Sequence, residues 1–173
     1  MMTFNFCPNC GTKGSVQELD ATNYECSACN WHFWNNPKAA VAIAFVKDGE
    51  LLYSKRGRAS DPAFGMYDLP GGFIDFGETA EAAAVREVFE ETSVRITEQD
   101  LQLIAVYHAD YNETTSTIDI VFLVRTWQGE FKPQDDSAAL EWKPLSFIND
   151  PQFSEIYYTG LDHLIAGEIA KTA

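Results

Sequence analysis

The chain has 173 residues, 46% of them hydrophobic and 22% charged, a composition typical of a folded soluble protein with one ordinary domain and a small additional unit. Its formal net charge is −14, with 12 Lys and Arg against 26 Asp and Glu. Because a nucleic-acid backbone is bound by clustered Lys and Arg, this balance disfavours nucleic acid as a partner, whereas a small phosphate ester can bind an acidic protein through divalent cations.

At the amino terminus, residues 1–6 lack a basic stretch followed by an apolar segment, so we expect no secretory signal. No apolar run reaches the roughly 20 residues that span a bilayer. These features predict a cytoplasmic protein without membrane contact.

All four cysteines, Cys7, Cys10, Cys26 and Cys29, lie within the first 30 residues. Their spacing, C-x2-C-x15-C-x2-C, is typical of a zinc ribbon, in which two tight turns each offer two thiolates to one tetrahedral ion. Two disulfides are the alternative, but they would require export from the reducing cytosol. The spacing therefore predicts a structural Zn²⁺ site.

The predicted ribbon occupies residues 1–36, and a second domain is expected over residues 37–173 after the Asn-Asn-Pro boundary. We expect Trp31 and Trp34 to pack the ribbon against that domain. His32 is a weaker alternative to Cys29 as a zinc ligand.

Three segments follow the boundary. The apolar run 39–46 predicts a strand buried on both faces. An Asp-Gly turn within residues 47–50 predicts a hairpin that returns as a strand over 51–56. Residues 57–78, rich in Gly, Pro and Asp, predict a loop.

Residues 79–92 predict a helix, with Thr79 as N-cap and Glu81 in the first turn. Its three consecutive alanines favour helix strongly. The apolar stripe expected to pack on a sheet consists of Val85, Val88 and Phe89.

The remaining chain predicts strands over 101–107 and 118–125 and a short strand at 140–142. Asp150-Pro151 is expected to open a closing helix. Its apolar positions are Ile156, Leu161, Leu164, Ile165 and Ile169. Interleaved strands and helices predict an α/β fold with a mixed sheet between helices.

Three carboxylates stand on one face of the 79–92 helix, because Glu87, Glu90 and Glu91 are spaced i, i+3 and i+4. A solvated acidic face is the plain interpretation of such a triplet. The alternative is a divalent-cation site, since Mg²⁺ accepts carboxylates together with substrate phosphates. Arg86 stands where it can steady a neighbouring carboxylate.

The surrounding residues favour the second interpretation, because segment 72–94 resembles the Nudix box, G-x5-E-x7-R-E-U-x-E-E-x-G-U, with U apolar. The matching positions are Gly72, Glu78, Arg86, Glu87, Val88, Glu90, Glu91 and Val94. Leu69-Pro70-Gly71 before it is similar to the family's usual entry into the box. Ser93 departs from the pattern, which has glycine there, and we expect it to cost about 1 kcal/mol of stability without affecting chemistry.

The resemblance implies a Nudix α/β/α sandwich over residues 37–173 and metal-dependent hydrolysis of a pyrophosphate bond in a nucleoside diphosphate derivative. Glu87, Glu90 and Glu91 would hold catalytic Mg²⁺ or Mn²⁺, Arg86 would orient Glu87, and Glu78 would assist from the preceding loop. The general base stays open. The candidates are Glu87, Glu113, Asp135, Asp136 and Glu141.

The resemblance also implies substrate contacts at Gly71 and Gly72. Arg56 matches a position where family members carry a basic residue near the phosphates, although a surface charge is the alternative. Tyr67 or Phe64 would stack on a base, although aromatic side chains more often serve packing.

A ribbon before the box resembles NADH pyrophosphatases and related nucleotide-sugar or flavin-nucleotide pyrophosphatases. However, their S-Q-P-W array is missing after Val94, and the proline that marks many ADP-ribose hydrolases is replaced by His108 and Ala109. The substrate therefore stays open among NADH, ADP-ribose, FAD and a nucleotide sugar, with a nucleoside monophosphate as the expected product. Association into a homodimer is left open.

Two functions of other classes compete with the hydrolase. A nucleic-acid-associated zinc ribbon is disfavoured, because residues 1–36 carry a net charge of −2. A non-catalytic, ligand-sensing Nudix-like module is disfavoured because every carboxylate of the box is present.

Overall fold

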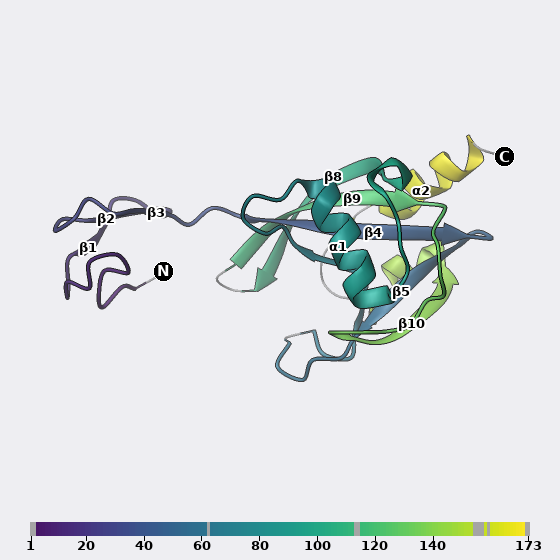
Figure 1. Ribbon diagram of the computed structural model, residues 1–173, viewed down its shortest axis with the longest axis horizontal. Helices are drawn as coiled ribbons and strands as arrows, with labels where there is room; N and C mark the ends of the chain where they lie inside the picture. Colours follow the sequence, from purple (N-terminus) through teal and green to yellow (C-terminus); the bar gives the residue numbers. More distant parts are fainter. Residues whose placement is uncertain (1–2, 62, 113–114, 154–157, 159, 172–173) are drawn as a thin grey trace.

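The computed structural model describes residues 3–61, 63–112, 115–153, 158 and 160–171. A three-stranded ribbon and a larger part built on a seven-stranded sheet follow one another along the chain. Figure 1 shows the ribbon extending from the end of the larger part where strand β4 begins. Within the described residues, neither helix has the length and apolar character needed to cross a membrane.

The ribbon consists of β1 (Val16–Glu18), β2 (Asn23–Cys26) and β3 (His32–Trp34), paired antiparallel in that order. Phe4 forms its aromatic core with Tyr24, Trp31 and Phe33, at ring-centroid distances of 5.4 to 5.6 Å. The expected packing on the second domain is wrong for Trp34, which is 58% exposed and stacks on His32. Trp31 instead stacks on Phe33, because so small a unit needs its aromatic side chains for its own core.

The larger sheet is mixed, with the order β10-β5-β4-β9-β8. Its strands are β4 (Lys38–Lys47), β5 (Glu50–Arg56), β6 (Tyr67–Asp68), β7 (Gly71–Phe73), β8 (Gln102–Asn112), β9 (Thr115–Val124) and β10 (Ser137–Pro144). Among these described strands, β4 and β9 run parallel and the other pairs are antiparallel. The predicted strands are confirmed, and β10 is longer than expected.

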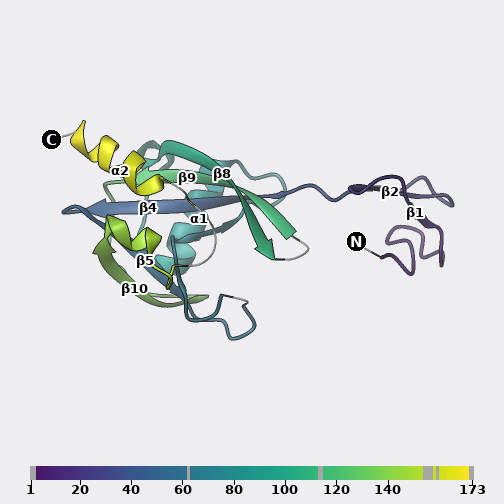
Figure 2. The same ribbon diagram turned by 180° about the vertical axis from the view of Figure 1, so that it is seen from behind.

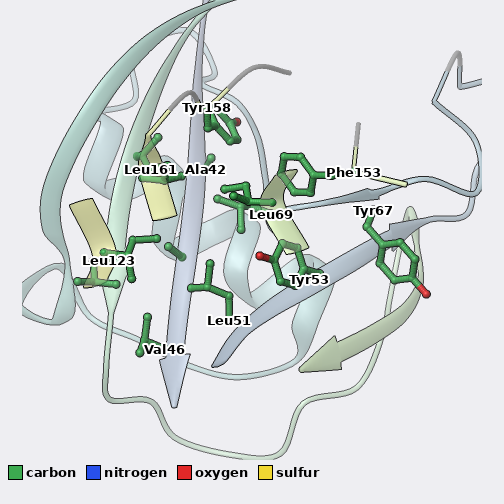
Figure 3. Packing of buried hydrophobic residues seen from close by; sticks show 14 residues of the cluster. Ala42, Val46, Leu51, Tyr53, Tyr67, Leu69, Leu123, Phe153, Tyr158 and Leu161 are labelled. Carbon is green, nitrogen blue, oxygen red and sulfur yellow. The ribbon is translucent and has the colours of Figure 1, made fainter. Parts of the chain in front are cut away.

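Strand β4 is buried on both faces, as its apolar run predicts, and separates two hydrophobic clusters. Ile43 and Phe45 point toward helix α1 (Ala80–Thr92), and Ala42 and Ala44 toward α2 (Leu161–Ala170) on the other side. Figures 1 and 2 show the two helices on opposite faces of the sheet, and Figure 3 shows the packing of the α2-side cluster. The fold is thus a three-layer α/β/α sandwich.

The β4–β5 hairpin opens soon after its turn, since β4 and β5 pair only at Val46–Leu51 and Lys47–Glu50. Beyond that point, β7 pairs with β4 and β6 pairs with β5. The prediction of a continuous loop over 57–78 is therefore wrong in its second half. Two strands of two and three residues, one of them containing two glycines, have no alternating pattern, so pairing with distant strands decides their conformation.

Helix α1 begins as predicted, because the Thr79 hydroxyl accepts a hydrogen bond from the Ala82 N–H at 3.1 Å. Val88 is fully buried, together with small residues such as Ala83 and Ala84. The expected packing of Phe89 on the sheet is wrong, because Phe89 is 44% exposed and lies under the Arg95 guanidinium. Small side chains let the helix approach the sheet closely and leave Phe89 at the rim.

The predicted helix start at Asp150-Pro151 is also wrong. Residues Leu145–Asn149 form the 3₁₀ helix η2, and the Asp150 side chain accepts a hydrogen bond from the Gln152 N–H, closing a turn. Helix α2 starts only at Leu161, after Gly160 with a φ of 78°. Ile156 lies outside the described residues. A second 3₁₀ helix, η1, spans Glu98–Asp100.

Ser93 ends α1 in the left-handed conformation with a φ of 65°, and its N–H donates to the Phe89 carbonyl at 3.1 Å. Replacing Ser93 by glycine should therefore raise the free energy of unfolding by about 1 kcal/mol, because glycine adopts this conformation without strain. Urea unfolding measures the change. Ser93→Ala keeps the strain and serves as control; a gain for alanine equal to that for glycine would contradict the explanation.

Candidate active site

A cavity of about 370 Å³ lies where the β4–β5 hairpin opens. Residues of α1, β4, β5, β6, β7 and β9 line it, together with the segment that precedes β10. The structure places seven of the residues predicted for catalysis, metal binding or substrate contact there. They are Arg56, Gly71, Gly72, Arg86, Glu87, Glu90 and Glu91.

Arg86 connects the carboxylates of the box to the preceding loop. Its guanidinium binds both oxygens of Glu78 at 2.9 Å, Glu87 at 2.8 Å and Glu90 at 3.1 Å. It also donates to the Phe73 carbonyl at 3.0 Å. This ion pair lowers the pKa of Glu78 to about 2, so Glu78 stays charged and fixes Arg86 from outside the cavity.

The two glycines bring β7 against both β4 and the carboxylates. The Gly71 N–H donates to Glu91 at 3.1 Å, and a Cβ at Gly71 would lie 2.1 Å from the Val41 carbonyl oxygen. A Cβ at Gly72 would lie 2.4 Å from a carboxylate oxygen of Glu87. Any larger residue would therefore separate the strands or displace Glu87.

Burial raises the pKa of Glu91 to about 8 and also raises that of Glu87. Arg86 binds Glu87 and Glu90, whereas the Gly71 N–H is the hydrogen-bond donor to Glu91 among the described residues. The helix face thus concentrates negative charge that protein cations only partly neutralise. Asp135 and Asp136 line the same cavity, so its donor set consists of carboxylate oxygens, the ligands that Mg²⁺ and Mn²⁺ prefer.

Arg56 lines the cavity but already has acidic neighbours. Its guanidinium donates to Asp61 at 2.6 and 2.9 Å and to Asp68 at 2.8 Å. Asp68 is buried at the end of β6. An incoming phosphate would therefore compete with Asp61, the partner that comes from the loop.

Two predicted contacts do not reach the cavity. Tyr67 is only 7% exposed, and its hydroxyl donates to Glu141 at 2.7 Å. Figure 3 shows the Tyr67 hydroxyl pointing away from the buried cluster. Phe64 is exposed and is absent from the lining residues.

The candidates for the general base differ in whether they line the cavity. Asp135 and Asp136 line the cavity, and Asp136 pairs with Arg58 at 2.5 Å. Glu141 is held outside it by Tyr67 and by Lys143 at 2.7 Å. Glu113 lies outside the described residues.

Five buried side chains with polar groups line the cavity without having been predicted from the sequence, namely Ser54, Asp68, Thr117, Asp119 and Tyr158. The sequence did point to Asp119, because it is the one charged residue inside the apolar segment 118–124. Nothing in the sequence pointed to Tyr158, because it reaches the cavity from a segment distant in sequence.

In the ribbon, the sulfurs of Cys7 and Cys29 are 3.7 Å apart and those of Cys10 and Cys26 3.8 Å apart. All four thiols are free, and their sulfurs lie within 4.8 Å of one another. Zinc–sulfur bonds of about 2.3 Å in a regular tetrahedron place sulfurs about 3.8 Å apart. The cluster therefore has the dimensions of a zinc site with four cysteine ligands.

Comparison with known proteins identifies the family. A family model described as NUDIX domain matches residues 35–162, well over half of the chain. The chain belongs to the Nudix family.

Among relatives, a Methanocaldococcus jannaschii protein named ADP-ribose pyrophosphatase is 35% identical over 117 residues, 67% of this chain and 67% of that protein. Haemophilus influenzae NAD-capped RNA hydrolase NudC is 33% identical over 96 residues, 56% of this chain and 36% of that protein. The chain thus spans only about a third of the length of the NudC relative.

Solved structures confirm the fold. The MutT NUDIX hydrolase from Burkholderia pseudomallei shares 31% identity at a TM-score of 0.58, covering 64% of this chain and 85% of that one. A NUDIX hydrolase from Nitrosomonas europaea shares 23% identity at a TM-score of 0.68, covering 97% of this chain and 92% of that one. The second likeness shows the fold alone, and it extends into the ribbon.

The raised pKa of Glu91 makes stability depend on pH. Folded Glu91, with a pKa of about 8 against an ordinary 4.5, binds its proton more tightly than unfolded glutamate does. Protonation therefore favours folding fully below the ordinary pKa, and this contribution is lost as pH rises through the folded pKa. Without added divalent cations, wild type should lose stability relative to Glu91→Gln between about pH 5 and about pH 8. Urea unfolding of both proteins tests this, and parallel pH profiles would refute it.

Proposed function

We propose that this Nudix protein hydrolyses the pyrophosphate bond of a nucleoside diphosphate derivative with Mg²⁺ or Mn²⁺, releasing a nucleoside monophosphate. The observation that carries the proposal is the convergence of Glu87, Glu90 and Glu91 on one cavity around Arg86. The names of the relatives support the reaction class.

The position of each residue in the site determines its proposed role. Glu87, Glu90 and Glu91 would hold the cation, which supplies charge neutralisation of the pyrophosphate and a lowered pKa of attacking water. Arg86 orients Glu87, and Glu78 orients Arg86 from the loop. Arg86 joins Glu78, Glu87 and Glu90 in one hydrogen-bonded network, whereas the Gly71 N–H holds Glu91.

Arg56 would bind a phosphate of the substrate after exchanging its contact with Asp61. Gly71 and Gly72 would let the substrate approach β7 closely, because neither has a side chain that shields the backbone. The stacking role of Tyr67 finds no support, since its ring lies outside the cavity lining.

Asp135 is our preferred general base. It lines the cavity and lies close enough to Glu87 for its charge to contribute to the raised Glu87 pKa. A carboxylate there can accept the proton of the attacking water. Asp136 is a weaker candidate because it is engaged by Arg58.

An adenosine diphosphate linked to a second sugar is the proposed substrate class. ADP-ribose and the NAD cap, named for the two relatives, both contain this unit. A capped RNA is disfavoured by the net charge of −14, which repels a polynucleotide backbone. ADP-ribose, NADH, FAD and nucleotide sugars are therefore the substrates to compare. The proposed zinc site needs reduced thiols, which supports the expected cytoplasmic location.

Glu87→Gln and Glu91→Gln should each reduce turnover about a hundredfold or more, because each removes a charge that holds the cation. Their folding should survive, since they relieve repulsion on one helix face. Product formation from the four substrates with Mg²⁺ and Mn²⁺, together with thermal melts, measures both effects.

Glu81→Gln is the matched control, because Glu81 carries the same charge on the same helix but is exposed in the first turn. It should keep near-normal turnover. Normal turnover in both Glu87→Gln and Glu91→Gln would move the catalytic centre away from this helix. Hydrolysis of nucleoside triphosphates alone would overturn the substrate class.

We expect one zinc ion per chain in the purified protein, because the four sulfurs have tetrahedral dimensions. Elemental analysis should find the ion in wild type and in Ser27→Ala, a control beside the cysteines. Cys10→Ser and Cys29→Ser should lose it. A protein without zinc, or one with a Cys7–Cys10 disulfide, would contradict the ribbon.

A further inference from the structure

Asp119 is a buried carboxylate of the cavity to which the proposed reaction gives no role. It lies on β9, is 4% exposed, and lines the same cavity as the box glutamates. In the sheet register Asp119 pairs with Ala40 of β4. It lies on the same face of β9 as Val121 and Leu123, which pack on the α2 side of the sheet, whereas Glu87 lies on α1 on the other side. One cavity touches both because the β4–β5 hairpin opens.

The carboxylate is held by neutral hydroxyl groups. Tyr158, itself buried, donates its hydroxyl to Asp119 at 3.3 Å, and the Thr117 side chain is its second hydrogen-bond partner. On β8 the residue opposite Asp119 is Tyr107, whose ring packs against that of Tyr158 at a centroid distance of 5.3 Å. Asp68, the other acid near Tyr158, is already paired with Arg56.

With two hydroxyl donors bound, this carboxylate still has unused hydrogen-bond acceptor positions. An ionised carboxylate offers about four acceptor positions, and among the described residues Thr117 and Tyr158 supply donors for two. Leaving a buried carboxylate incompletely hydrogen-bonded is costly, so donors from a ligand would be bound strongly there. The neighbouring positions on β4 are Ala40 and Ala42, which line the cavity with small side chains.

A vicinal diol fits these requirements. Two adjacent sugar hydroxyls donate in parallel to the two oxygens of one carboxylate, and the ring can lie over the alanine surface. A divalent cation fits less well, because hydroxyl donors occupy part of the carboxylate and Asp68 is neutralised by Arg56.

We propose that Asp119, fixed by Thr117 and Tyr158, forms a subsite for the vicinal diol of a ribose joined to the pyrophosphate. The inference rests on the proposed function and names the substrate feature that the cavity selects. Asp119 thereby determines specificity and does not take part in bond cleavage. The ribose can belong to the nucleoside or to the second sugar, which share this chemistry.

Binding of single-phosphate probes tests the subsite without hydrolysis. Titration calorimetry with Mn²⁺ compares AMP with 2′-deoxy-AMP, and ribose 5-phosphate with 2-deoxyribose 5-phosphate. Wild type should bind the ribo form of at least one pair about 10- to 100-fold more tightly, the effect expected of a hydrogen bond to a charged group. The pair that responds identifies the source of the diol.

Asp119→Asn keeps the size of the side chain but replaces one acceptor oxygen by a donor, so it should abolish the preference. Asp110→Asn removes the same charge from a side chain on β8 that is 83% exposed, and it should keep the preference. Thr117→Val is a second variant, expected to weaken the preference by loosening Asp119.

Equal binding of both members of each pair by wild type would overturn the diol subsite. If a folded Asp119→Asn variant still preferred the ribo form, Asp119 would not be the residue that binds the diol. Neither result bears on hydrolysis, which the Glu87→Gln assay decides separately. Conversely, a diol preference in a protein that hydrolyses no pyrophosphate would leave the subsite standing and refute the proposed function.

Discussion

The interaction on which the site depends is the contact of one guanidinium, that of Arg86, with three carboxylates and a carbonyl. It joins the loop carrying Glu78 to the carboxylate face of α1. Arg86 nevertheless brings one positive charge to a face with three glutamates. Glu91 is left with a backbone N–H and a raised pKa, and it is here that a cation would contribute most.

A second constraint is steric and serves the first. Helix α1 can lie close to the sheet because it buries alanines and Val88, and β7 can lie close to both because Gly71 and Gly72 have no side chains. The collision distances show that the glycines are required by the backbone of β4 and by Glu87. They therefore belong to the architecture of the carboxylate site whether or not substrate touches them.

Local signals in the sequence predicted what local interactions decide. Thr79 caps α1, Ser93 ends it, and β4 is buried on both faces, because hydrogen bonds and apolar periodicity within a few residues determine these features. The short strands β6 and β7 depend on partners far along the chain. The same division holds in the site: Glu87 of the motif lines the cavity, whereas Tyr67 lies outside the lining, and Tyr158 lines it without any signal in the sequence.

The charge of the cavity explains why the box glutamates and Asp119 can serve different parts of one ligand. Its lining contains eight carboxylates and three arginines, a formal balance of −5. A pyrophosphate entering alone would meet strong repulsion in a partly desolvated space, where electrostatic interactions are stronger than in water. A cation held by the box glutamates of α1 would offset that repulsion there but not at Asp119, which lies on β9. A neutral donor such as a sugar hydroxyl is the chemistry that such a carboxylate can bind beside a phosphate, so one acidic cavity can hold both ends of the same substrate.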